Sequence, residues 1–275
     1  MAEPLATAPI GVFDSGIGGL SVLQALRHAL PDEHFVYLAD AGYAPYGERD
    51  QAQVLRRAEA IARYLLETQQ VKALVIACNT ATAAAVGPLR ERYLRVPIIG
   101  IEPALKPAAA LSRTGHIGVL ATRGTLQSEK FAALLARQSP NTHFVLQPCD
   151  GLAAAIEQDD TATVARLAAH YLDALGPLGH RDAEVDAVVL GCTHYALVGE
   201  VFGSLLAGRC SLHEAGIPVA HRARQVLAER GWLCPAQPGA GSIQLLSTGD
   251  PALLHKAATR WLCQAADVQS LALVS

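Results

Sequence analysis

Two stretches of the sequence share one pattern: VIACNT at positions 75–80 and VLGCTH at positions 189–194. Each is an apolar run that reaches a small residue, then Cys78 or Cys192, then small hydrogen-bonding side chains. Such a run predicts a buried strand of a parallel sheet, whose carboxyl end is where open α/β sheets bind ligands. Two thiols so placed, one from each half of the chain, are expected to face a single substrate carbon from opposite sides. That arrangement suits the inversion of a carbon centre by removal and return of a proton.

Two further pairs of strand-like runs recur in the same order along the chain. IGVFDS begins at Ile10 and IGVLAT at Ile117, an offset of 107 in the numbering. FVYLAD begins at Phe35 and FVLQPC at Phe144, an offset of 109, and the offset between the two cysteines is 114. Single matches between apolar strands arise by chance, but three in one order at nearly constant spacing indicate a duplicated unit.

Amphipathic segments separate these runs. Residues 20–30 and 50–69 in the first half, and 125–137 and 161–175 in the second, carry apolar residues at helical spacing. Strands that alternate with helices predict a mostly parallel sheet flanked by helices in each half. The expected fold class is therefore α/β, with two pseudo-symmetric lobes and the active site at the lobe interface.

The segment after the second cysteine has no counterpart in the repeat. Residues 242–247 predict a late strand, and Asp250 followed by Pro251 predicts an N-cap and first helical residue of a final helix that runs to about Cys263. We expect this tail to return to the first lobe.

Prolines indicate where the chain passes from one lobe to the other. Pro103 and Pro107 predict a crossing just after residue 101. The first lobe is accordingly expected to be discontinuous, formed by residues 1–101 and 209–275. Residues 102–208 are expected to form the second lobe.

Composition excludes several classes of protein. The 275 residues are 51% apolar with a formal charge of −3, and no basic run suggests nucleic acid or an anionic membrane surface as a partner. No apolar stretch approaches the ~20 residues of a membrane-spanning helix, and the start lacks a basic signal-peptide region. We therefore expect a cytoplasmic protein with no membrane partner. None of the six cysteines forms a CxxC pair, so no metal site is expected.

The loop DSGIGGLS at positions 14–21 is a candidate ligand-binding loop. It follows a strand and opens a helix, and with Asp40 at the end of the next strand it resembles a dinucleotide fingerprint. The third glycine of that fingerprint is replaced by Ser21, and Asp14 and Ser15 are polar where a plain turn needs neither. We favour instead backbone N–H groups at a helix N-terminus that hold a carboxylate.

The residues around the first cysteine predict a short helix over 81–86, interrupted at 87–88. A cysteine at the start of a helix meets the positive end of its dipole, which favours the thiolate at Cys78. Asn79 or Thr80 is read first as a cap of that helix and second as a substrate contact.

The second cysteine carries a histidine two positions later. Cys192 and His194 would supply only two metal ligands, and no second pair lies near them. A histidine that modulates the neighbouring thiol fits better. In the loop that holds Tyr46 and Gly47, a surface turn and a closure over ligand both remain open, and Glu157 reads by default as a solvated helix carboxylate.

At these residues the chain resembles glutamate racemases. The matching runs are FDSGIGGL at 13–20, PYG at 45–47, ACNTAT at 77–82 and GCTHY at 191–195, with a weaker match at 247–251. The run CNT alone marks a wider superfamily that includes aspartate and hydantoin racemases. The resemblance implies cofactor-independent racemisation of L-glutamate and D-glutamate, which supplies D-glutamate for peptidoglycan and the cell wall. It also implies a homodimer, since family members often form dimers. The chain departs from the family pattern at residues 212–215.

The resemblance also assigns roles to individual residues. It makes Cys78 and Cys192 the acid/base pair of a two-base mechanism, with Cys78 taking the proton from the D-enantiomer and Cys192 from the L-enantiomer. It implies substrate contacts at Asp14, Ser15, Tyr46, Gly47, Asn79, Thr80, Thr193 and His194. The assisting ionisable groups that it implies are Asp14, Asp40, Glu157 and His194.

Three alternative functions remain open from the residues. The first is a relative that acts on aspartate. His194 and the DSGIGG and PYG runs favour glutamate over this alternative. The second is a two-lobed solute-binding protein without catalysis, which would need no matched thiols. The third is a cysteine-nucleophile hydrolase, for which the sequence shows no histidine partner of Cys78.

Overall fold

The strands of the protein form two separate parallel sheets. The computed structural model describes residues 5–236, 241–263 and 267–273, and within these ranges the sheets have the orders β10-β9-β2-β1-β3-β4 and β6-β5-β7-β8. The larger sheet contains β1 (Ile10–Asp14), β2 (Phe35–Ala39), β3 (Ala73–Ile76), β4 (Ile98–Gly100), β9 (Ile243–Ser247) and β10 (Val268–Ser270). The smaller contains β5 (His116–Ala121), β6 (His143–Pro148), β7 (Ala187–Leu190) and β8 (Ser211–His213). The predicted α/β class is confirmed.

The register of the strands matches the internal repeat. The order β2-β1-β3-β4 in one sheet corresponds to β6-β5-β7-β8 in the other. In the first, Ile10 pairs with Phe35 on one side and Ala73 on the other. In the second, Ile117, which follows Ile10 by 107 positions, pairs with Phe144 and Ala187. Phe144 follows Phe35 by 109 positions, and Ala187 follows Ala73 by 114. The offsets found in the sequence are thus those of equivalent hydrogen-bonded positions, and the two sheets are structural copies.

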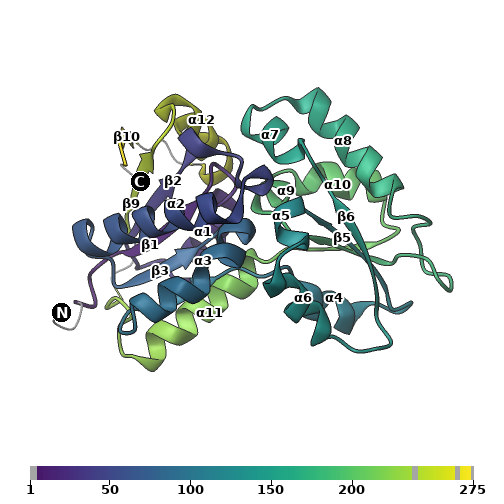
Figure 1. The fold of residues 1–275 in the computed structure, drawn as a ribbon, viewed down its shortest axis with the longest axis horizontal. Helices are drawn as coiled ribbons and strands as arrows, with labels where there is room; N and C mark the ends of the chain where they lie inside the picture. The colour runs from purple at the N-terminus through teal and green to yellow at the C-terminus, as the bar shows by residue number, and fades with distance from the viewer. Residues whose placement is uncertain (1–4, 237–240, 264–266, 274–275) are drawn as a thin grey trace.

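Helices cover both faces of the larger sheet (Figure 1). One face carries α1 (Leu20–Ala29), α11 (Gly216–Glu229) and α12 (Pro251–Leu262), and the other carries α2 (Gln51–Arg63) and α3 (Asn79–Arg92). Alternate residues of each strand supply the two layers of the core. In β3, Val75 packs in the layer below α1 while Leu74 packs in the layer below α2 and α3. Burial on both faces explains why the strand reads as a continuous apolar run.

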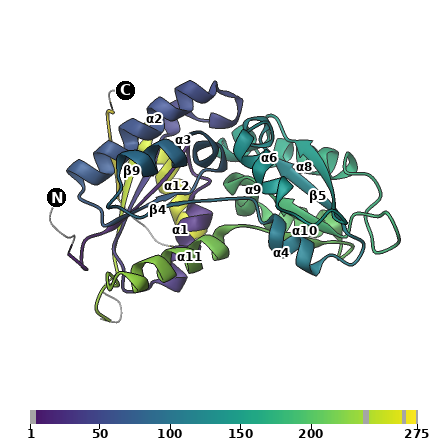
Figure 2. The same ribbon diagram turned by 60° about the horizontal axis from the view of Figure 1, so that its bottom comes forward.

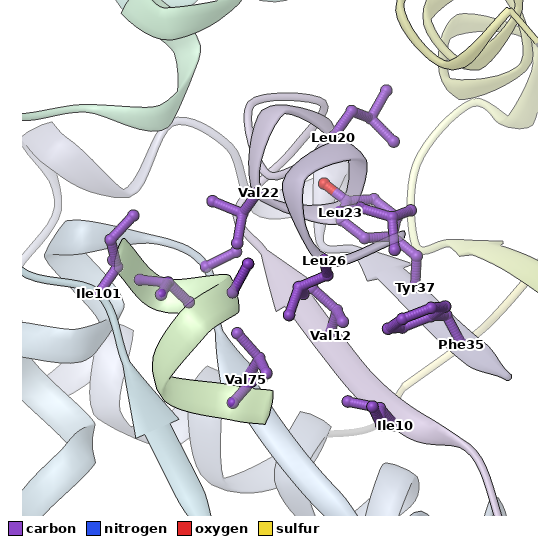
Figure 3. Close-up of a cluster of buried hydrophobic side chains, with 14 of the residues drawn as sticks. Ile10, Val12, Leu20, Val22, Leu23, Leu26, Phe35, Tyr37, Val75 and Ile101 are labelled. Carbon is purple, nitrogen blue, oxygen red and sulfur yellow. The ribbon is translucent and has the colours of Figure 1, made fainter. Parts of the chain in front are cut away.

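The packing of α1 shows how its sequence directs it onto the sheet. Leu20, Leu23 and Leu26 are three residues apart and fully buried, and Figure 3 shows Leu26 next to Val12 of β1 and Leu23 next to Tyr37 of β2. Each buried leucine contributes roughly 1.5–3 kcal/mol to stability. Because the helix is anchored in this way, the loop that precedes it is held at the carboxyl end of β1.

Several helices surround the smaller sheet in the described part of the chain. They are α4 (Leu105–Leu111), α5 (Arg123–Leu126), α6 (Glu129–Ala136), α7 (Leu152–Glu157), α8 (Thr161–Asp173), α9 (Thr193–Leu197) and α10 (Gly199–Leu206). Side chains of α7, α8 and α10 bury one face of this sheet, and those of α4 and α6 bury the other. Both lobes therefore have the predicted architecture of a parallel sheet between helical layers.

The C-terminal segment returns to the first lobe, as predicted. β9 pairs with β2, and β10 extends the same sheet. Asp250 caps α12 by accepting the N–H of Ala252, and Pro251 is the first helical residue. The yellow C-terminal elements lie beside the purple and blue N-terminal ones in Figure 1.

The chain crosses between the lobes twice, as Figures 1 and 2 show. The first crossing joins β4 to α4, where the two prolines predicted it. The second lies between β8 and α11, because Ser211–His213 pairs with the edge of β7 in the smaller sheet. The predicted boundary at 208/209 is therefore too early, since the open edge of β7 takes up one more strand before the chain returns.

Two predicted helices differ from those in the structure. The helix after Cys78 does not stop at 87–88 but continues through Pro88 to Arg92, because proline removes only one main-chain donor and the buried Leu89 holds the next turn against the core. The segment 125–137 is split into α5 and α6, since the Ser128 side chain accepts the N–H of Phe131 and starts a new helix.

A short helical connection follows β2. It contains the 3₁₀ turns η1 (Ala41–Tyr43) and η2 (Tyr46–Glu48). At the end of α2, a π-helical turn, η3 (Tyr64–Thr68), leads into β3. Among the described residues, no helix is both long and apolar enough to cross a bilayer.

Candidate active site

The two cysteines occupy equivalent strand ends and line one cavity between the lobes. Cys78 follows β3 and precedes α3, while Cys192 follows β7 and precedes α9. Both are buried, free thiols. The first lobe contributes to this cavity Ser15, Pro45, Tyr46, Gly47, Cys78, Asn79 and Thr80, and the second contributes Thr122, Ala153, Cys192, Thr193 and His194. The structure thus brings together most of the residues singled out in the sequence.

The cavity is closed around very little space. Its volume is about 10 Å³, room for about one water molecule. An amino acid is far larger, so a ligand of that size enters only when the lobes or the lining side chains move apart. The contacts between the lobes around the cavity therefore decide both how the site is built and how it opens.

The surroundings of Cys78 favour its neutral thiol. Its Sγ accepts the N–H of Ala81 at 3.4 Å and lies 3.9 Å from the Ser15 hydroxyl. Burial raises the pKa of Cys78 well above its ordinary value, and the nearby Asp14 carboxylate raises it further. The helix-end N–H acts in the opposite direction but is outweighed. The sequence-based expectation of a thiolate at this position is therefore wrong, because it counted the helix dipole and not the loss of water.

Cys192 lies beside a histidine rather than a carboxylate. Nδ1 of His194 lies 3.8 Å from its Sγ, and Nε2 of the same ring lies 2.7 Å from a carboxylate oxygen of Glu157. Burial alone would lower the pKa of His194, but the hydrogen bonds and charges of Cys192 and Glu157 raise it well above the usual range. A doubly protonated ring donates to both partners, so a positive charge stands next to the Cys192 thiol.

The glycine loop after β1 holds a carboxylate that belongs to the protein itself. The N–H of Ile17 donates to Glu157 at 3.0 Å, across the lobe interface. A Cβ on Gly16 would overlap the same carboxylate, and one on Gly18 would overlap the ring of His194. The glycines therefore permit close approach of the second lobe. Glu157, read from the sequence as a solvated side chain, is instead an interface residue.

Asp14 is completely buried at the centre of this interface. Its carboxylate accepts the N–H of Gly16 at 2.9 Å and the hydroxyl of Thr193 at 3.0 Å, the latter from the other lobe. Burial raises the pKa of Asp14, partly offset by His194. Asp14 thus joins the end of β1 to the residue that follows Cys192.

Asn79 and Thr80 are not caps of α3, contrary to the first interpretation of the sequence. Cys78 itself is the N-cap residue. The side-chain oxygen of Asn79 is buried and has no hydrogen-bond partner among the described residues. An acceptor left unpaired in a closed cavity costs about 1–3 kcal/mol, so it is well placed to receive a donor group of a ligand.

Threonines of the two lobes meet at the cavity. The hydroxyl of Thr80 lies 3.0 Å from that of Thr122 in the other lobe, and Thr122 donates to Thr125 at 2.9 Å. None of the sequence motifs above includes Thr122. The internal repeat does point to it, because Thr122 follows β5 as Ser15 follows β1, at the offset of 107 that relates these two strands.

The structure does not bring Asp40, a predicted site residue, to the lining of the cavity. Asp40 is buried beneath the loop that carries Tyr46, and both of its oxygens accept hydrogen bonds from side chains of the first lobe. No group of three or more potential metal ligands occurs among the residues that the structure describes.

Comparisons with known proteins agree with the fold and identify the family. The family model "Asp/Glu/Hydantoin racemase" matches residues 10–220. A glutamate racemase from Ectopseudomonas mendocina is 45% identical over 259 residues, which cover 91% of this chain and 96% of that protein. The crystal structure of a glutamate racemase isoform from Bacillus anthracis superimposes with a TM-score of 0.85 at 31% identity, covering 97% of this chain and 98% of that one. A glutamate racemase from Francisella tularensis in complex with D-glutamate has a TM-score of 0.81 at 29% identity, covering 98% of both chains.

The fold, the paired cysteines and these matches define a racemase. The chain belongs to the Asp/Glu/hydantoin racemase family.

Proposed function

We propose that this protein interconverts L-glutamate and D-glutamate without a cofactor, using Cys78 and Cys192 as two bases on opposite faces of the α-carbon. The observation that carries the proposal is the pair of buried thiols at equivalent strand ends that line one cavity. Glutamate as the substrate is supported by relatives that bear the name glutamate racemase, and by the similar Francisella tularensis enzyme in complex with D-glutamate.

The different surroundings of the two thiols give the proposed mechanism a direction. The raised pKa of His194 places a cation beside Cys192, while burial and Asp14 raise the pKa of Cys78 and favour its neutral thiol. Cys192 then removes the α-proton of the L-enantiomer, and Cys78 delivers its own proton to the opposite face. The reverse reaction starts with the protonation states exchanged.

The α-hydrogen is far less acidic than a thiol, whose reference pKa is ~8.5, so the protein must stabilise a carbanion-like transition state. Preorganised hydrogen-bond donors in a closed site with little water are the strongest means available. Ser15, Thr122 and Thr193 line the cavity, and their hydroxyls, which donate to groups of the protein in the closed state, would turn to the substrate once it enters. The unpaired oxygen of Asn79 suits the substrate ammonium, which carries donors only.

The product D-glutamate would serve peptidoglycan synthesis in the cytoplasm. Besides its small-molecule substrate, we propose a second copy of the chain as partner in a homodimer. The second candidate substrate is aspartate, which the wider family includes by name. His194 after Cys192, together with the DSGIGG and PYG runs, favours glutamate.

One assay tests the proposal. The purified protein is incubated with either enantiomer of glutamate in deuterium oxide without added cofactor, and the optical rotation and the α-deuterium content of both enantiomers are followed. We expect turnover in both directions, with deuterium in the early product and hydrogen retained in the recovered substrate. Deuterium in both enantiomers at early times would indicate a single base. Faster turnover of aspartate than of glutamate would reverse the choice of substrate.

A further inference from the structure

A buried polar network lies beneath the cavity wall and has no part in the proton transfers proposed above. Asp40 accepts hydrogen bonds from Nε of Arg57 at 3.0 Å, from Nη2 of Arg57 at 2.7 Å and from the hydroxyl of Thr248 at 2.7 Å. The phenol of Tyr46 donates to the same carboxylate. Asp40, Arg57 and Tyr46 are each at most 4% exposed.

The Tyr46 phenol connects this network to the cavity. Burial and the charge of Asp40 raise the pKa of Tyr46, so the phenol stays a neutral donor. Tyr46 begins η2, and both Tyr46 and Gly47 line the cavity. The N–H of Arg49 closes this turn by donating to the carbonyl of Tyr46 at 3.1 Å. The position of the Asp40 carboxylate therefore sets the position of one wall of the active site.

The wall is held in part by the C-terminal segment. Thr248 directly follows β9, and its hydroxyl oxygen also accepts the N–H of Gly42 at 3.2 Å. Nη1 of Arg57 donates to the carbonyl of Leu273 at 3.3 Å, and the Tyr43 ring lies 3.7 Å from the guanidinium carbon of Arg57. The tail thus supplies two contacts to a network whose other members all precede α3 in the chain.

The second lobe has no equivalent of this buried polar network among its described residues. The residue 109 positions after Asp40 is Cys149, a thiol whose Sγ donates to the carbonyl of Gln147. The tail is likewise absent from the repeat. A buried Asp–Arg pair contributes little net stability relative to apolar side chains of the same size, so the number of bonds converging on Asp40 is better explained by the geometry that they fix.

We propose that Arg57 and Thr248 are positioning residues for glutamate binding, which act through Asp40 on the Tyr46–Gly47 wall. The C-terminal segment is then a functional part of the active site, although its residues do not line the cavity. This inference rests on the proposed function for its substrate, but the order of the wall can be measured without any substrate.

Thr248→Val is the most direct test, because it keeps the side-chain shape and removes one bond to a buried carboxylate. We expect KM for both enantiomers to rise about tenfold, with a smaller change in kcat. Because the enantiomers are equally stable, kcat/KM must fall by the same factor in both directions. Thr248→Ser, which keeps the hydroxyl, is expected to restore KM. Thr259→Val in α12 is the matched control, since the Thr259 hydroxyl bonds only locally to His255.

Hydrogen exchange supplies the readout that is independent of substrate. In Thr248→Val the amide of Arg49 is expected to exchange about tenfold faster than in the wild type, and in the Thr259→Val control at the wild-type rate. Arg57→Lys keeps the positive charge but loses the pair of hydrogen bonds to Asp40, so the Arg49 amide is expected to exchange faster in this variant too. Arg90→Lys is its control, because Arg90 donates to the carbonyl of Ile98 elsewhere in the first lobe.

The outcomes separate the two proposals. A lower melting temperature in Thr248→Val with unchanged KM and unchanged Arg49 exchange would show a merely structural role and overturn the inference. Wild-type protein without glutamate turnover would overturn the proposed function, while faster Arg49 exchange in Thr248→Val would still show that Thr248 orders the wall.

Discussion

Cys78 and Cys192 stand at equivalent positions of the two sheets, yet their neighbours differ. Cys78 is the N-cap of the 14-residue α3 and accepts a main-chain N–H from it. Cys192 precedes the five-residue α9, makes no cap bond with its side chain, and lies against His194. The position of Thr80, two places after the first cysteine, is taken by His194 in the second lobe.

This difference teaches that duplication and catalysis place different demands on the two halves. The repeated backbone puts two thiols in the lining of one cavity, but identical surroundings would not distinguish a proton acceptor from a proton donor. Cys192 has a neighbouring cation, whereas burial and the Asp14 carboxylate raise the pKa of Cys78. The proposed mechanism uses such an inequality, because one thiol has to remove a proton while the other delivers one.

The largest effect is expected from removal of either thiol. Cys78→Ala and Cys192→Ala should each lower racemisation about 10²–10⁴-fold, the usual contribution of a general acid or base. Each variant should retain α-hydrogen exchange of only the enantiomer that faces the remaining thiol. Optical rotation and deuterium content measure the two effects. Cys210→Ala, at a thiol of the smaller lobe that does not line the cavity, is the control. Racemisation at the wild-type rate in either active-site variant would refute the two-base mechanism.

The next effect should follow from making the second site resemble the first. His194→Thr installs the residue of the corresponding position in the first lobe and removes the cation beside Cys192. We expect kcat/KM at neutral pH to fall about 10–100-fold in both directions. The pH–rate profile should change shape, because the His194 imidazole, whose pKa is raised in the wild type, no longer contributes a charge beside the thiol. A profile of unchanged shape would show that the charge of His194 does not govern the reaction.

A smaller effect is expected on stability when His194 loses its carboxylate partner. Because the pKa of His194 is raised in the folded protein, its contribution to stability is complete below its unfolded pKa of about 6.5 and disappears as the pH rises through the folded value. Glu157→Gln should therefore reduce the free energy of unfolding by about 1–3 kcal/mol near pH 6.5, and by less at alkaline pH. Urea unfolding between these conditions measures the difference, with Glu91→Gln at an exposed position as control. A deficit that grows with pH would contradict the assignment.

The smallest effect is expected where the lobes touch on the Cys78 side. A Cβ on Gly47 would lie 2.7 Å from the Thr122 side chain, so Gly47→Ala should hold the lobes slightly apart and raise KM about fivefold. Gly87→Ala is the matched control, because nothing lies within 4 Å of its added methyl group in α3. It should stabilise the protein by up to about 1 kcal/mol with unchanged KM. Equal KM values for the two variants would show that close lobe contact does not limit binding.

Some site residues could be predicted from local sequence, and others could not. Cys78 and Cys192 were found because a buried strand and its carboxyl end leave a clear pattern in the chain. Glu157 was not distinguished from a solvated carboxylate, since its partner Ile17 is 140 residues away and contributes only a main-chain N–H. The side chain of Ile17 gives no sign that its main-chain N–H donates to a distant carboxylate.

Asp40 illustrates the opposite difficulty. Its place at a strand end and its resemblance to a family position suggested a group close to the reaction. Its bonds to Arg57 and Thr248, 17 and 208 residues away, instead turn it beneath the wall. A strand end predicts the neighbourhood of a site, but the direction of a side chain depends on partners that the chain supplies from a distance.

The sequence by itself determined the parallel α/β lobes, their duplication down to the strand register, and the two thiols at matching strand ends. These follow from apolar periodicity and from a repeat, which are local or translational properties of the chain. The tertiary structure decided which thiol faces a cation, which carboxylate the glycine loop holds, and which wall the C-terminal segment supports. Those features depend on contacts between residues remote in the chain and on the removal of water from their charges, and neither is encoded in any one segment.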